Sequence, residues 1–586
     1  MIIFKTLKKF LYENRREYIT GIAFLIFIDI LQLLIPMIYK SFADAYQQTT
    51  LDGDGIILYA LLIIASGLSI GTGRFMWRIK IHSVARKAEY HLRDRIFSKL
   101  LTLTPTFYNE NSAGDLMALA TNDVNAIRMT VGMGIVLLVD SSLMIVLSIG
   151  MMLKTLGLSL TLLSLSLMPI IVIFVAWYGK RIHIKFRQVQ DSFGEVSDDA
   201  REIFSGIRIV KANAADELFI DKFQRASKKN FDANISMVKY QAFFRPFIMF
   251  VSASCFFIIL LFGGRAVINR TISLGDFSSA IMYLNLLVWP LMAFGMIISQ
   301  YQRGSASMER INELLDVVPD IIDPQPNAEK MTIEKIEFKN VSFKYAGSEN
   351  LALEDISFTL ERGKTLAIIG STGSGKSTII NLLLRLYDLE EGQGEILING
   401  IPIRECSIKA TRDDIGAVLQ ESFLFSMTIG DNIAFSEEGQ YDHDDVVAAA
   451  KTAAVHSNII DFPDQYDTVL GERGVTLSGG QRQRTAIARA LFRNPEVLIF
   501  DSSFSAVDTE TEDEILNNLQ DDFDKKAIIL VSHRISTVKD ADEILVMDDG
   551  KIIERGNNDE LIALNGLYKE LNDKQQLEKI IEEMEA

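Results

Sequence analysis

The sequence predicts an α-helical transmembrane domain of six spans with long cytoplasmic extensions, followed by an α/β domain built around a phosphate-binding P-loop. Three observations lead to this fold class. Apolar segments long enough to cross a bilayer occupy the first half of the chain. In the second half, short β-branched runs alternate with amphipathic helical patterns. One of these runs leads into the glycine-rich motif Gly370-x4-Gly375-Lys376-Ser377.

The length, charge and cysteine content exclude several simple interpretations. With 586 residues, the chain is too long for a single hydrophobic core. Its formal net charge of −17 argues against a nucleic-acid partner, because phosphate backbones are met by an excess of Lys and Arg. Cys255 and Cys406 lie far apart and predict neither a disulfide framework nor a metal knuckle. No cleavable signal peptide is expected, since no small-residue cleavage site precedes the first apolar run.

The N-terminal residues 1–17 predict a helix that lies in the membrane interface. Phe4 and Leu7 alternate with Lys5 and Lys8, which is typical of a helix with its bases toward anionic headgroups.

Six apolar segments predict the spans of a transmembrane domain over residues 18–303, each long enough to cross a hydrocarbon core of roughly 30 Å. They lie at about 18–43, 56–77, 130–153, 156–179, 243–268 and 276–299. Residues 44–55, between the first two spans, contain three Asp and no Lys or Arg, whereas Arg and Lys are frequent after the second span. Because basic loops stay inside, we expect a multi-pass cell-membrane protein with both termini and the α/β domain in the cytoplasm.

The two long inside segments, residues 80–129 and 180–242, keep a helical period. The spans are therefore expected to continue as helices well into the cytoplasm. Each excursion must turn around, and the polar stretches 108–115 and 211–217 are the candidates for a short helix that touches another domain.

The α/β domain is expected over residues 331–572. Before it, the sixth span is followed by a polar helical stretch at 302–313, and the linker predicted over residues 304–330 ends in several prolines. After it, residues 573–586 predict a charged C-terminal helix. We expect a mixed, largely parallel sheet with helices on its faces, whose strands include 365–369, 395–398, 415–419, 497–500, 527–531 and 543–547.

The P-loop motif predicts that the chain binds a nucleoside triphosphate. Its glycines let backbone N–H groups converge on phosphate oxygens, and the following helix contributes the positive end of its dipole. Lys376 would reach the β and γ phosphates, and Ser377 would offer its hydroxyl to Mg²⁺. The predicted cradle comprises Gly370, Ser371, Thr372, Gly373, Ser374, Gly375, Lys376, Ser377 and Thr378.

Two further motifs follow the P-loop. Residues 497–500 form an apolar strand that ends in Asp501, at the place where P-loop proteins hold Mg²⁺ with a carboxylate. Between the P-loop and this strand lies Leu477-Ser-Gly-Gly-Gln481, followed by a helical pattern. With these motifs the chain resembles the ATPase subunits of ABC transporters, and with six spans ahead of them it resembles an ABC exporter half-transporter.

This resemblance implies ATP and Mg²⁺ as cofactors, with Ser377, Gln420 and Asp501 around the metal. It also implies roles for single residues: Tyr345 stacks on adenine, Gln420 contacts the attacking water, His533 contacts the γ-phosphate, Asp508 lies in a loop that crosses a dimer interface, and Glu472 lies in a segment that meets the cytoplasmic helices. In this family two ATPase domains enclose two nucleotides, so that Ser478, Gly479, Gly480, Gln481 and Asp508 act on the partner's ATP.

One position departs from the family pattern. The family has a glutamate after the strand's aspartate, where it polarises the attacking water, and here Ser502 follows Asp501. A serine hydroxyl is too short and too weakly basic for that role. The chain therefore resembles the degenerate-site subunit of a bacterial heterodimeric multidrug ABC exporter, with a partner that keeps its glutamate. The alternatives are a homodimeric lipid or peptide exporter with an ATP-trapping substitution and a nucleotide-gated membrane regulator.

The substrate site is the least defined part of the prediction. Asp29 and Asp140 lie deep in apolar segments, where ionisable residues are expensive and are functional candidates. They attract cationic amphiphiles, or they pair with a base on the partner subunit. Arg74 and Arg245 lie closer to the ends of their segments and are expected to snorkel. The expected partners are a second half-transporter, a hydrophobic small molecule and the bilayer, with no nucleic acid.

Overall fold

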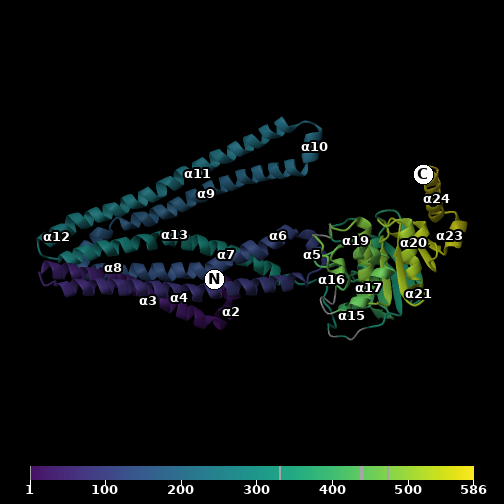
Figure 1. The fold of residues 1–586 in the computed structure, drawn as a ribbon, viewed down its shortest axis with the longest axis horizontal. Helices are drawn as coiled ribbons and strands as arrows, with labels where there is room; N and C mark the ends of the chain where they lie inside the picture. The colour runs from purple at the N-terminus through teal and green to yellow at the C-terminus, as the bar shows by residue number, and fades with distance from the viewer. Residues whose placement is uncertain are drawn as a thin grey trace. The chain divides into compact units, whose positions relative to one another are not determined.

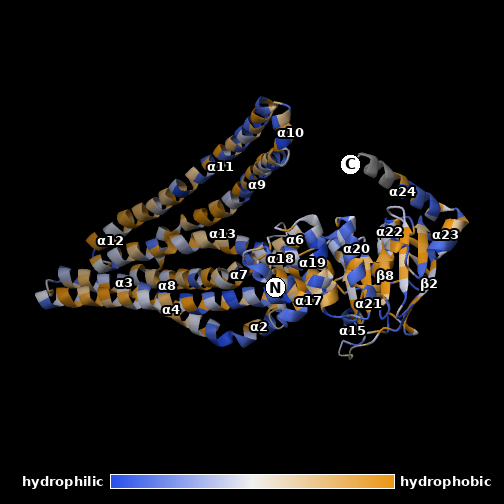
Figure 2. Ribbon diagram, turned by 45° about the vertical axis from the view of Figure 1, so that its right-hand side comes forward, coloured by the Kyte–Doolittle hydropathy of each residue, from blue (hydrophilic) through white to orange (hydrophobic). Residues whose placement is uncertain are grey.

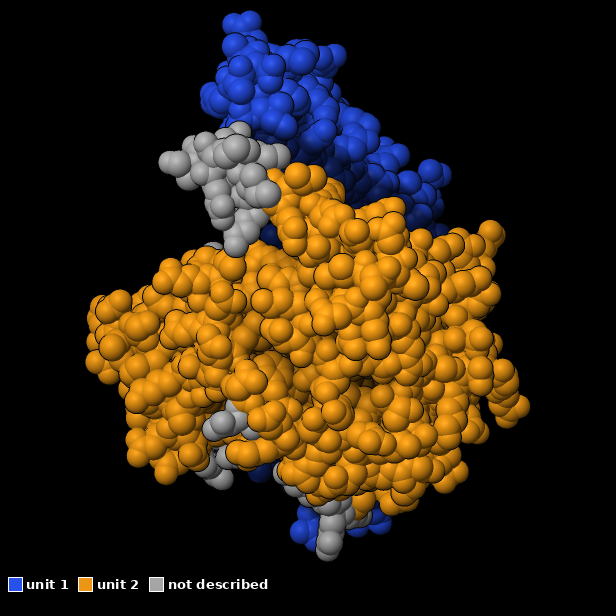
Figure 3. Space-filling model, turned by 90° about the vertical axis from the view of Figure 1, so that its right-hand side faces the viewer, with its two compact units in different colours: residues 1–101, 113–317 blue, residues 102–112, 318–586 orange. Residues whose placement is uncertain are grey.

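The structure is a computed structural model that describes residues 2–326, 328, 331–435, 441–471, 474 and 476–585. It divides into two compact units (Figure 3). Unit 1 comprises Met1–Leu101 and Ala113–Val317, and unit 2 comprises Thr102–Ser112 and Val318–Ala586. The short segment Thr102–Ser112 is therefore an excursion of the first half of the chain that packs with the second half.

Unit 1 is helical throughout its described residues, and Figure 1 shows its long helices. The helices are α1 Ile2–Thr6, α2 Lys8–Glu13, α3 Arg15–Gln47, α4 Gly53–Leu100, α6 Ala113–Ala118, α7 Val124–Met129, α8 Ile135–Leu165, α9 Met168–Ser205, α10 Ile207–Ala212, α11 Asp216–Ile258, α12 Gly264–Ile268 and α13 Leu274–Asp316. Three π-helical turns, η1 Leu119–Asp123, η2 Thr130–Gly134 and η3 Ile259–Gly263, join consecutive helices. The predicted cytoplasmic extensions are helical, as the sequence indicated.

Five helices in the described residues are long and apolar enough to cross a membrane. They are Arg15–Gln47, Gly53–Leu100, Ala113–Leu165, Asp216–Ile268 and Leu274–Asp316. The predicted fourth span, 156–179, is not among them, because α8 ends at Leu165 and α9 begins at Met168. Gly157, with φ 73° and ψ 174°, breaks the helical geometry of α8 at the start of the predicted fourth span. Figure 2 shows hydrophobic residues gathered along α12 and the adjoining part of α11.

Helices in unit 1 approach closely where they carry glycine. A Cβ on Gly73 of α4 would lie 2.8 Å from Ile28 of α3, and one on Gly21 of α3 would lie 2.6 Å from Ile81 of α4. Small residues at helix crossings let backbones meet without a driving force from water. At the start of α13, Gly275 donates its amide to Asp44 of α3 at 2.9 Å. These contacts hold α3 between α4 and α13.

The N-terminal segment packs on protein. Leu7 is 1% exposed, Phe10 stacks on His91 of α4 with ring centroids 5.5 Å apart, and Thr6 hydrogen-bonds Asn312 of α13. Leu7 also separates α1 from α2, so the predicted single helix is two short ones. A location in the membrane interface stays a prediction.

Unit 2 contains two sheets. Its strands are β1 Lys335–Phe343, β2 Leu353–Glu361, β3 Thr365–Gly370, β4 Glu395–Ile398, β5 Ile401–Pro402, β6 Ile415–Val418, β7 Val497–Asp501, β8 Ala527–Val531, β9 Glu543–Asp548 and β10 Lys551–Gly556. The larger sheet has the order β10-β9-β3-β8-β7-β6 and is parallel except for β10. The smaller sheet, β2-β1-β4-β5, is antiparallel. The prediction of one mixed sheet is therefore wrong, since β4 pairs with β1 in a second sheet.

The helices of unit 2 are α5 Pro105–Glu110, α14 Lys376–Leu383, α15 Ile408–Asp413, α16 Ile429–Ile433, α17 His443–Thr452, α18 His456–Ile460, α19 Gly479–Phe492, α20 Thr509–Asn518, α21 Gln520–Phe523, α22 Ile535–Val538, α23 Asn558–Leu564 and α24 Leu567–Glu585. A 3-10 turn, Gln465–Asp467, follows α18.

The parallel sheet separates two hydrophobic cores. On β3, Leu366 and Ile368 belong to the core shared with the antiparallel sheet and α14, whereas Ala367 and Ile369 belong to the core under α16 to α20. Because neighbouring strands alternate in the same way, both faces of the sheet are covered, which explains why these strands read as continuous apolar runs. Helix α13 continues to Asp316, because Ile311 and Leu314 stay buried, and the predicted linker thus starts as helix.

The contact between α3 and α13 yields a test of packing. A Cβ on Gly275 would lie 2.4 Å from the Lys40 carbonyl oxygen, which belongs to rigid helix backbone. We expect Gly275→Ala to lower the free energy of unfolding by about 1–3 kcal/mol. Gly150→Ala is the matched control, because no atom lies within 4 Å of the added Cβ in α8. Thermal melting of the detergent-purified protein measures both, and equal midpoints would contradict the close contact.

Candidate functional site

The predicted site residues lie at one edge of the parallel sheet. The P-loop follows β3, His533 follows β8, Asp501 ends β7 and Gln420 follows β6. These four strands are neighbours in the order β3-β8-β7-β6 and run parallel. Their carboxyl ends therefore meet at the same edge, which is where open α/β sheets bind ligands.

The P-loop wraps around its own lysine. Lys376, the first residue of α14, is buried and donates to the carbonyl oxygens of Gly370 at 3.0 Å and Ser371 at 2.7 Å. Gly375 has φ 98°, and a Cβ there would lie 2.4 Å from the Ala352 carbonyl oxygen. The glycine is thus required both by conformation and by space. Thr372 and Gly373 are exposed at the tip of the loop, while Ser374 and Thr378 are buried.

Asp501 and Ser377 meet beside the P-loop. The Ser377 hydroxyl donates to the Asp501 carboxylate. The other carboxylate oxygen, Oδ1, is buried and has no hydrogen-bond partner in the described part of the chain. Burial raises the pKa of Asp501, although the Ser377 hydrogen bond and the charges of Lys376 and His533 lower it. A buried, underbonded carboxylate beside a hydroxyl fits a hard divalent cation such as Mg²⁺.

Burial also lowers the pKa values of the two basic side chains of the site, Lys376 and His533. Desolvation lowers the pKa of the Lys376 ammonium, and the Asp501 charge opposes that effect. Burial likewise lowers the pKa of His533, with a further lowering by Lys376 and opposition from a hydrogen bond to the Gly370 backbone and from Asp501. The lowered pKa favours the neutral form of the His533 imidazole, which lies beside the positive charge of the Lys376 ammonium.

Tyr345 packs over the start of α14. Its hydroxyl hydrogen-bonds the Thr378 hydroxyl at 3.1 Å and accepts from Asn381 at 3.3 Å. Its ring meets Phe343 and Tyr387 edge to face, at centroid distances of 4.9 and 5.1 Å. The aromatic side chain thus stands beside the P-loop helix, within an aromatic cluster.

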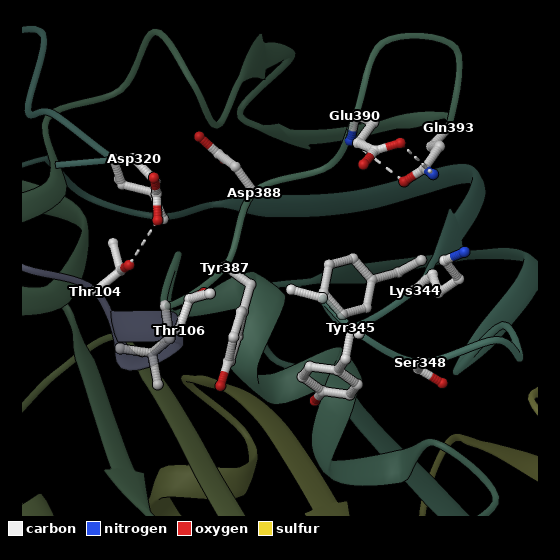
Figure 4. A pocket seen from close by; sticks show the side chains of 15 residues that line it. Thr104, Thr106, Asp320, Lys344, Tyr345, Ser348, Tyr387, Asp388, Glu390 and Gln393 are labelled. Carbon is white, nitrogen blue, oxygen red and sulfur yellow. Dashed lines mark hydrogen bonds between the residues drawn. The ribbon is translucent and has the colours of Figure 1, made fainter. Parts of the chain in front are cut away.

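A cavity of about 550 Å³ adjoins Tyr345 (Figure 4). Thr104 and Thr106, which flank the first residue of α5, line one side of it, and Tyr387 stands next to Tyr345. Asn109 of α5 donates to the Tyr387 hydroxyl at 3.3 Å. The prediction that the stretch around residues 108–115 introduces a short helix touching another domain is confirmed, although Pro105 starts that helix earlier than expected.

The segment after Gln420 is fixed to α19. Gln420 itself is exposed. Beyond it, Arg489 of α19 donates to the Phe423 carbonyl at 2.9 Å and to the carbonyl and side-chain oxygens of Asn432 at 2.8 and 3.0 Å. Its guanidinium also lies 5.2 Å from the centre of the Phe435 ring, and burial lowers the pKa of Arg489 to about 10. Movement of this segment therefore involves α19.

The Leu477-Ser-Gly-Gly-Gln481 segment starts α19. Ser478 is the N-cap and forms a capping box, in which its hydroxyl accepts from the Gln481 amide at 3.2 Å and its amide donates to the Gln481 side chain at 2.9 Å. The amides of Gly479 and Gly480 stand in the first helical turn, where no intrahelical acceptor exists. They form, with the dipole of α19, a place for negative charge.

Asp508 and Ser502 occupy the loop after β7. Asp508 caps α20, with both carboxylate oxygens accepting from Thr511 at 2.9 Å. Ser502 has φ 51° and donates its amide to the Val531 carbonyl at 2.8 Å, which fixes its Cβ next to Asp501. Gln483 of α19 holds this loop by accepting from the Ala506 amide at 2.9 Å. Glu472 lies outside the described residues.

Several residues that build the site carry no local sequence signal. Gln575 of α24 accepts from the Ile535 amide at 2.9 Å and donates to the His533 carbonyl at 2.6 Å. Gln575 and Gln483, like Asn432 and Arg489, act through partners far along the chain. Only Gln483 could have been singled out from the sequence, because it is a polar residue on the buried face of an amphipathic helix.

Comparisons with known proteins identify the family. Residues 18–291 match the family described as "ABC transporter transmembrane region", and residues 353–505 match the family described as "ABC transporter". The chain belongs to the ABC transporters that fuse a membrane domain to an ATPase domain. It is a multi-pass membrane transporter with a cytoplasmic ATPase domain, and ATP drives the transport.

Similar proteins share almost the whole chain. YheI of Bacillus subtilis, named a probable multidrug resistance ABC transporter ATP-binding/permease protein, is 35% identical over 98% of both chains. The multidrug resistance-like ATP-binding protein MdlA of Escherichia coli is 33% identical over 100% of this chain and 98% of its own. The ATP-dependent lipid A-core flippase of Haemophilus influenzae is 33% identical over 92% and 91%.

A solved structure has the same fold. The ATP-bound structure of a bacterial Atm1-family ABC exporter matches with a TM-score of 0.77 and 28% sequence identity. The match covers 96% of this chain and 98% of that one. Both units are therefore those of an ABC exporter.

The environment of Asp501 yields a test of metal binding. Asp501→Asn removes a buried charge with an underbonded oxygen, so we expect it to stabilise the nucleotide-free protein by about 1 kcal/mol. If Asp501 binds Mg²⁺, the same change removes that ligand, so we expect that Mg²⁺ no longer raises the melting temperature of the ATP-bound protein. Melting curves of the full-length protein with ATP and either EDTA or Mg²⁺ measure both effects.

Asp513→Asn is the control for this test, because it removes the same charge from an exposed position on α20. The control variant keeps the full Mg²⁺ effect. A full Mg²⁺ effect in Asp501→Asn as well would contradict the assignment of Asp501 to the metal.

Proposed function

We propose that this chain is the degenerate-site half of a heterodimeric ABC exporter for hydrophobic or amphipathic compounds. Its own P-loop binds ATP with Mg²⁺ and hydrolyses it slowly or not at all, while its Leu477–Gln481 segment completes a competent site on the partner. The observation that carries this proposal is Ser502, which stands where the family's general base is expected.

The geometry around Ser502 supports a loss of base catalysis. Its backbone is fixed by the hydrogen bond to Val531, so its hydroxyl stays next to Asp501 at a serine's reach. The adjacent Ser503 is turned into the domain, where its hydroxyl donates to the Val418 carbonyl at 3.1 Å. The carboxylates of Asp501 and Asp508 are engaged with Ser377 and Thr511. A water near Ser502 thus meets a hydroxyl rather than a base.

The remaining residues of the site support ATP binding. Tyr345 stacks on adenine, Gly370 to Thr378 enclose the phosphates, and Lys376 and His533 face the γ-phosphate. Ser377, Asp501 and Gln420 hold Mg²⁺, which would neutralise phosphate charge when bound. The Asn109–Tyr387 hydrogen bond supports communication with the membrane half, since α5 is an excursion of that half and Tyr387 touches Tyr345.

The need for a partner subunit has independent support in unit 1. Helices α9 and α11 are joined through the short helix α10 (Figure 1). Large apolar side chains around this turn are exposed: Phe204 is 73%, Ile209 70% and Leu218 65% exposed. The turn belongs to a cytoplasmic excursion, where such exposure is unfavourable unless another protein covers it. The intact Leu477–Gln481 segment likewise serves only a second ATPase domain.

The membrane half fits six spans. Residues 156–179 form the fourth span across the short interruption at Ser166 and Leu167, and the break at Gly157 lies at the start of this span. The names of YheI and MdlA favour multidrug cargo, whereas the lipid A-core flippase favours a lipid as the second candidate.

Adding a base at residue 502 tests the proposal. In the complex with its partner, mutating the partner's catalytic glutamate to Gln should abolish ATP turnover. Adding Ser502→Glu to this chain should then restore hydrolysis by about 100-fold or more over that background, since a positioned base contributes 10²–10⁴-fold. Steady-state phosphate release measures the rates.

Ser502→Gln is the matched control, because it has the size of the glutamate without the base, and it should restore nothing. The chain purified alone should hydrolyse ATP slowly or not at all. Rapid turnover by the chain alone, or restoration by Ser502→Gln, would contradict a degenerate site.

A further inference from the structure

A buried carboxylate occupies the helical core of unit 1. Asp29 lies on α3 in the stripe that also buries Leu25, Ile28 and Leu33, and its exposure is 0%. Neither of its carboxylate oxygens accepts a hydrogen bond from a donor in the described residues. An ionisable residue at this depth is expensive, and its retention points to a function.

A second carboxyl group lies within hydrogen-bonding reach of Asp29. It belongs to Asp140 of α8, which is only half-buried. Two carboxylates this close in an apolar surrounding cannot both be ionised, so the pair shares one proton. The predicted pairing of each aspartate with a base on the partner subunit is therefore unnecessary.

The groups around the pair leave it with a negative charge. From α4, the positive charge of Arg74 acts on both carboxyl groups, but Arg74 is exposed and forms no salt bridge with either of them in the described residues. From α13, the Tyr283 hydroxyl donates to the Leu33 carbonyl at 3.2 Å and is thus occupied. One proton on two carboxyl groups leaves a single negative charge.

We propose that Asp29 and Asp140 form a cation site in which Asp29 carries the proton and Asp140 binds the head of a lipophilic monovalent cation. The substrate class is thus a hydrophobic compound with one delocalised or ammonium charge. This inference deepens the proposed export function and rests on it for the identity of the ligand as cargo.

Burial assigns the two roles. The fully buried Asp29 is better neutral, and as a carboxylic acid it donates a hydrogen bond to Asp140. Asp140, which is only half-buried, then stays ionised. A lipophilic cation loses little hydration on entry and meets one carboxylate among apolar helices, where the attraction is weakly screened. No proton is taken up or released, because the shared proton stays on Asp29.

The two aspartates offer variants with the same change of charge. Asp140→Asn removes the carboxylate that binds, and we expect it to weaken binding of tetraphenylphosphonium at least tenfold. Asp29→Asn keeps a donor to Asp140 in nearly the same shape, so affinity should change by less than about threefold. Equilibrium binding to the full-length protein in phosphatidylcholine nanodiscs measures both, with a neutral triphenyl compound as reference probe.

A third variant keeps the test decisive if either substitution unfolds the protein. Arg74→Gln removes a positive charge that competes for the pair, so tetraphenylphosphonium should bind at least threefold more tightly, while the neutral probe is unaffected. Unchanged affinity in Asp140→Asn, or equal losses in Asp29→Asn and Asp140→Asn, would overturn the cation site. Weaker binding in Arg74→Gln would overturn it as well.

The binding assay separates this inference from the export proposal, because it needs neither ATP nor turnover. If the protein binds the cation through Asp140 but shows no ATP-driven export in vesicles, the export proposal is overturned and the proposed cation site remains. If the protein exports a neutral compound and its cation binding does not depend on Asp140, only the proposed cation site is overturned.

Discussion

The parallel pairing of β3, β8, β7 and β6 brings an ammonium, an imidazole and a carboxylate to one sheet edge, and the nucleotide chemistry depends on this arrangement. Lys376 and Asp501 are both buried, so each loses hydration that only a partner of opposite charge can replace. They stabilise each other in part, and the loop carbonyls of Gly370 and Ser371 complete the lysine's hydrogen bonds. Phosphate and Mg²⁺ supply the charges that this edge is built to receive.

The loops around this edge are tied to one another rather than free. Arg489 fixes the segment after Gln420 to α19, Gln483 fixes the loop after Ser502 to the same helix, and Gln575 holds the backbone around His533. Helix α19 also carries the Leu477–Gln481 segment at its N-terminus. A displacement near Gln420 therefore reaches the Leu477–Gln481 segment, which we propose faces a second ATPase domain, through hydrogen bonds rather than through a flexible chain.

Much of the fold follows from the sequence because its signals are local. A strand buried on both faces reads as an apolar run, and the predicted 395–398 and 527–531 agree with β4 and β8. Pairing is not local, which is why β4 was assigned to the wrong sheet. The helical stretch expected at 302–313 is confirmed and continues to Asp316, since Ile311 and Leu314 of α13 are buried, so the linker begins later than residue 304.

The residues of the candidate site likewise fall into those that the sequence predicts and those that it does not. The motif residues could be named from spacing and resemblance, whereas Tyr387, Asn432, Arg489 and Gln575 could not, because each acts through contacts with residues distant in sequence. The closeness of Asp29 and Asp140 was likewise hidden, since they lie on different helices and only the packing of α3 against α8 brings them together. Helical period predicts which face is buried but not which residue it meets.

The nucleotide left at each ATP site after turnover shows whether the two sites of the complex differ. A photoreactive ATP analogue labelled on both the base and the γ-phosphate would be cross-linked after several cycles of hydrolysis. The account predicts an intact triphosphate on this chain and a diphosphate on its partner. A diphosphate on both subunits would contradict it.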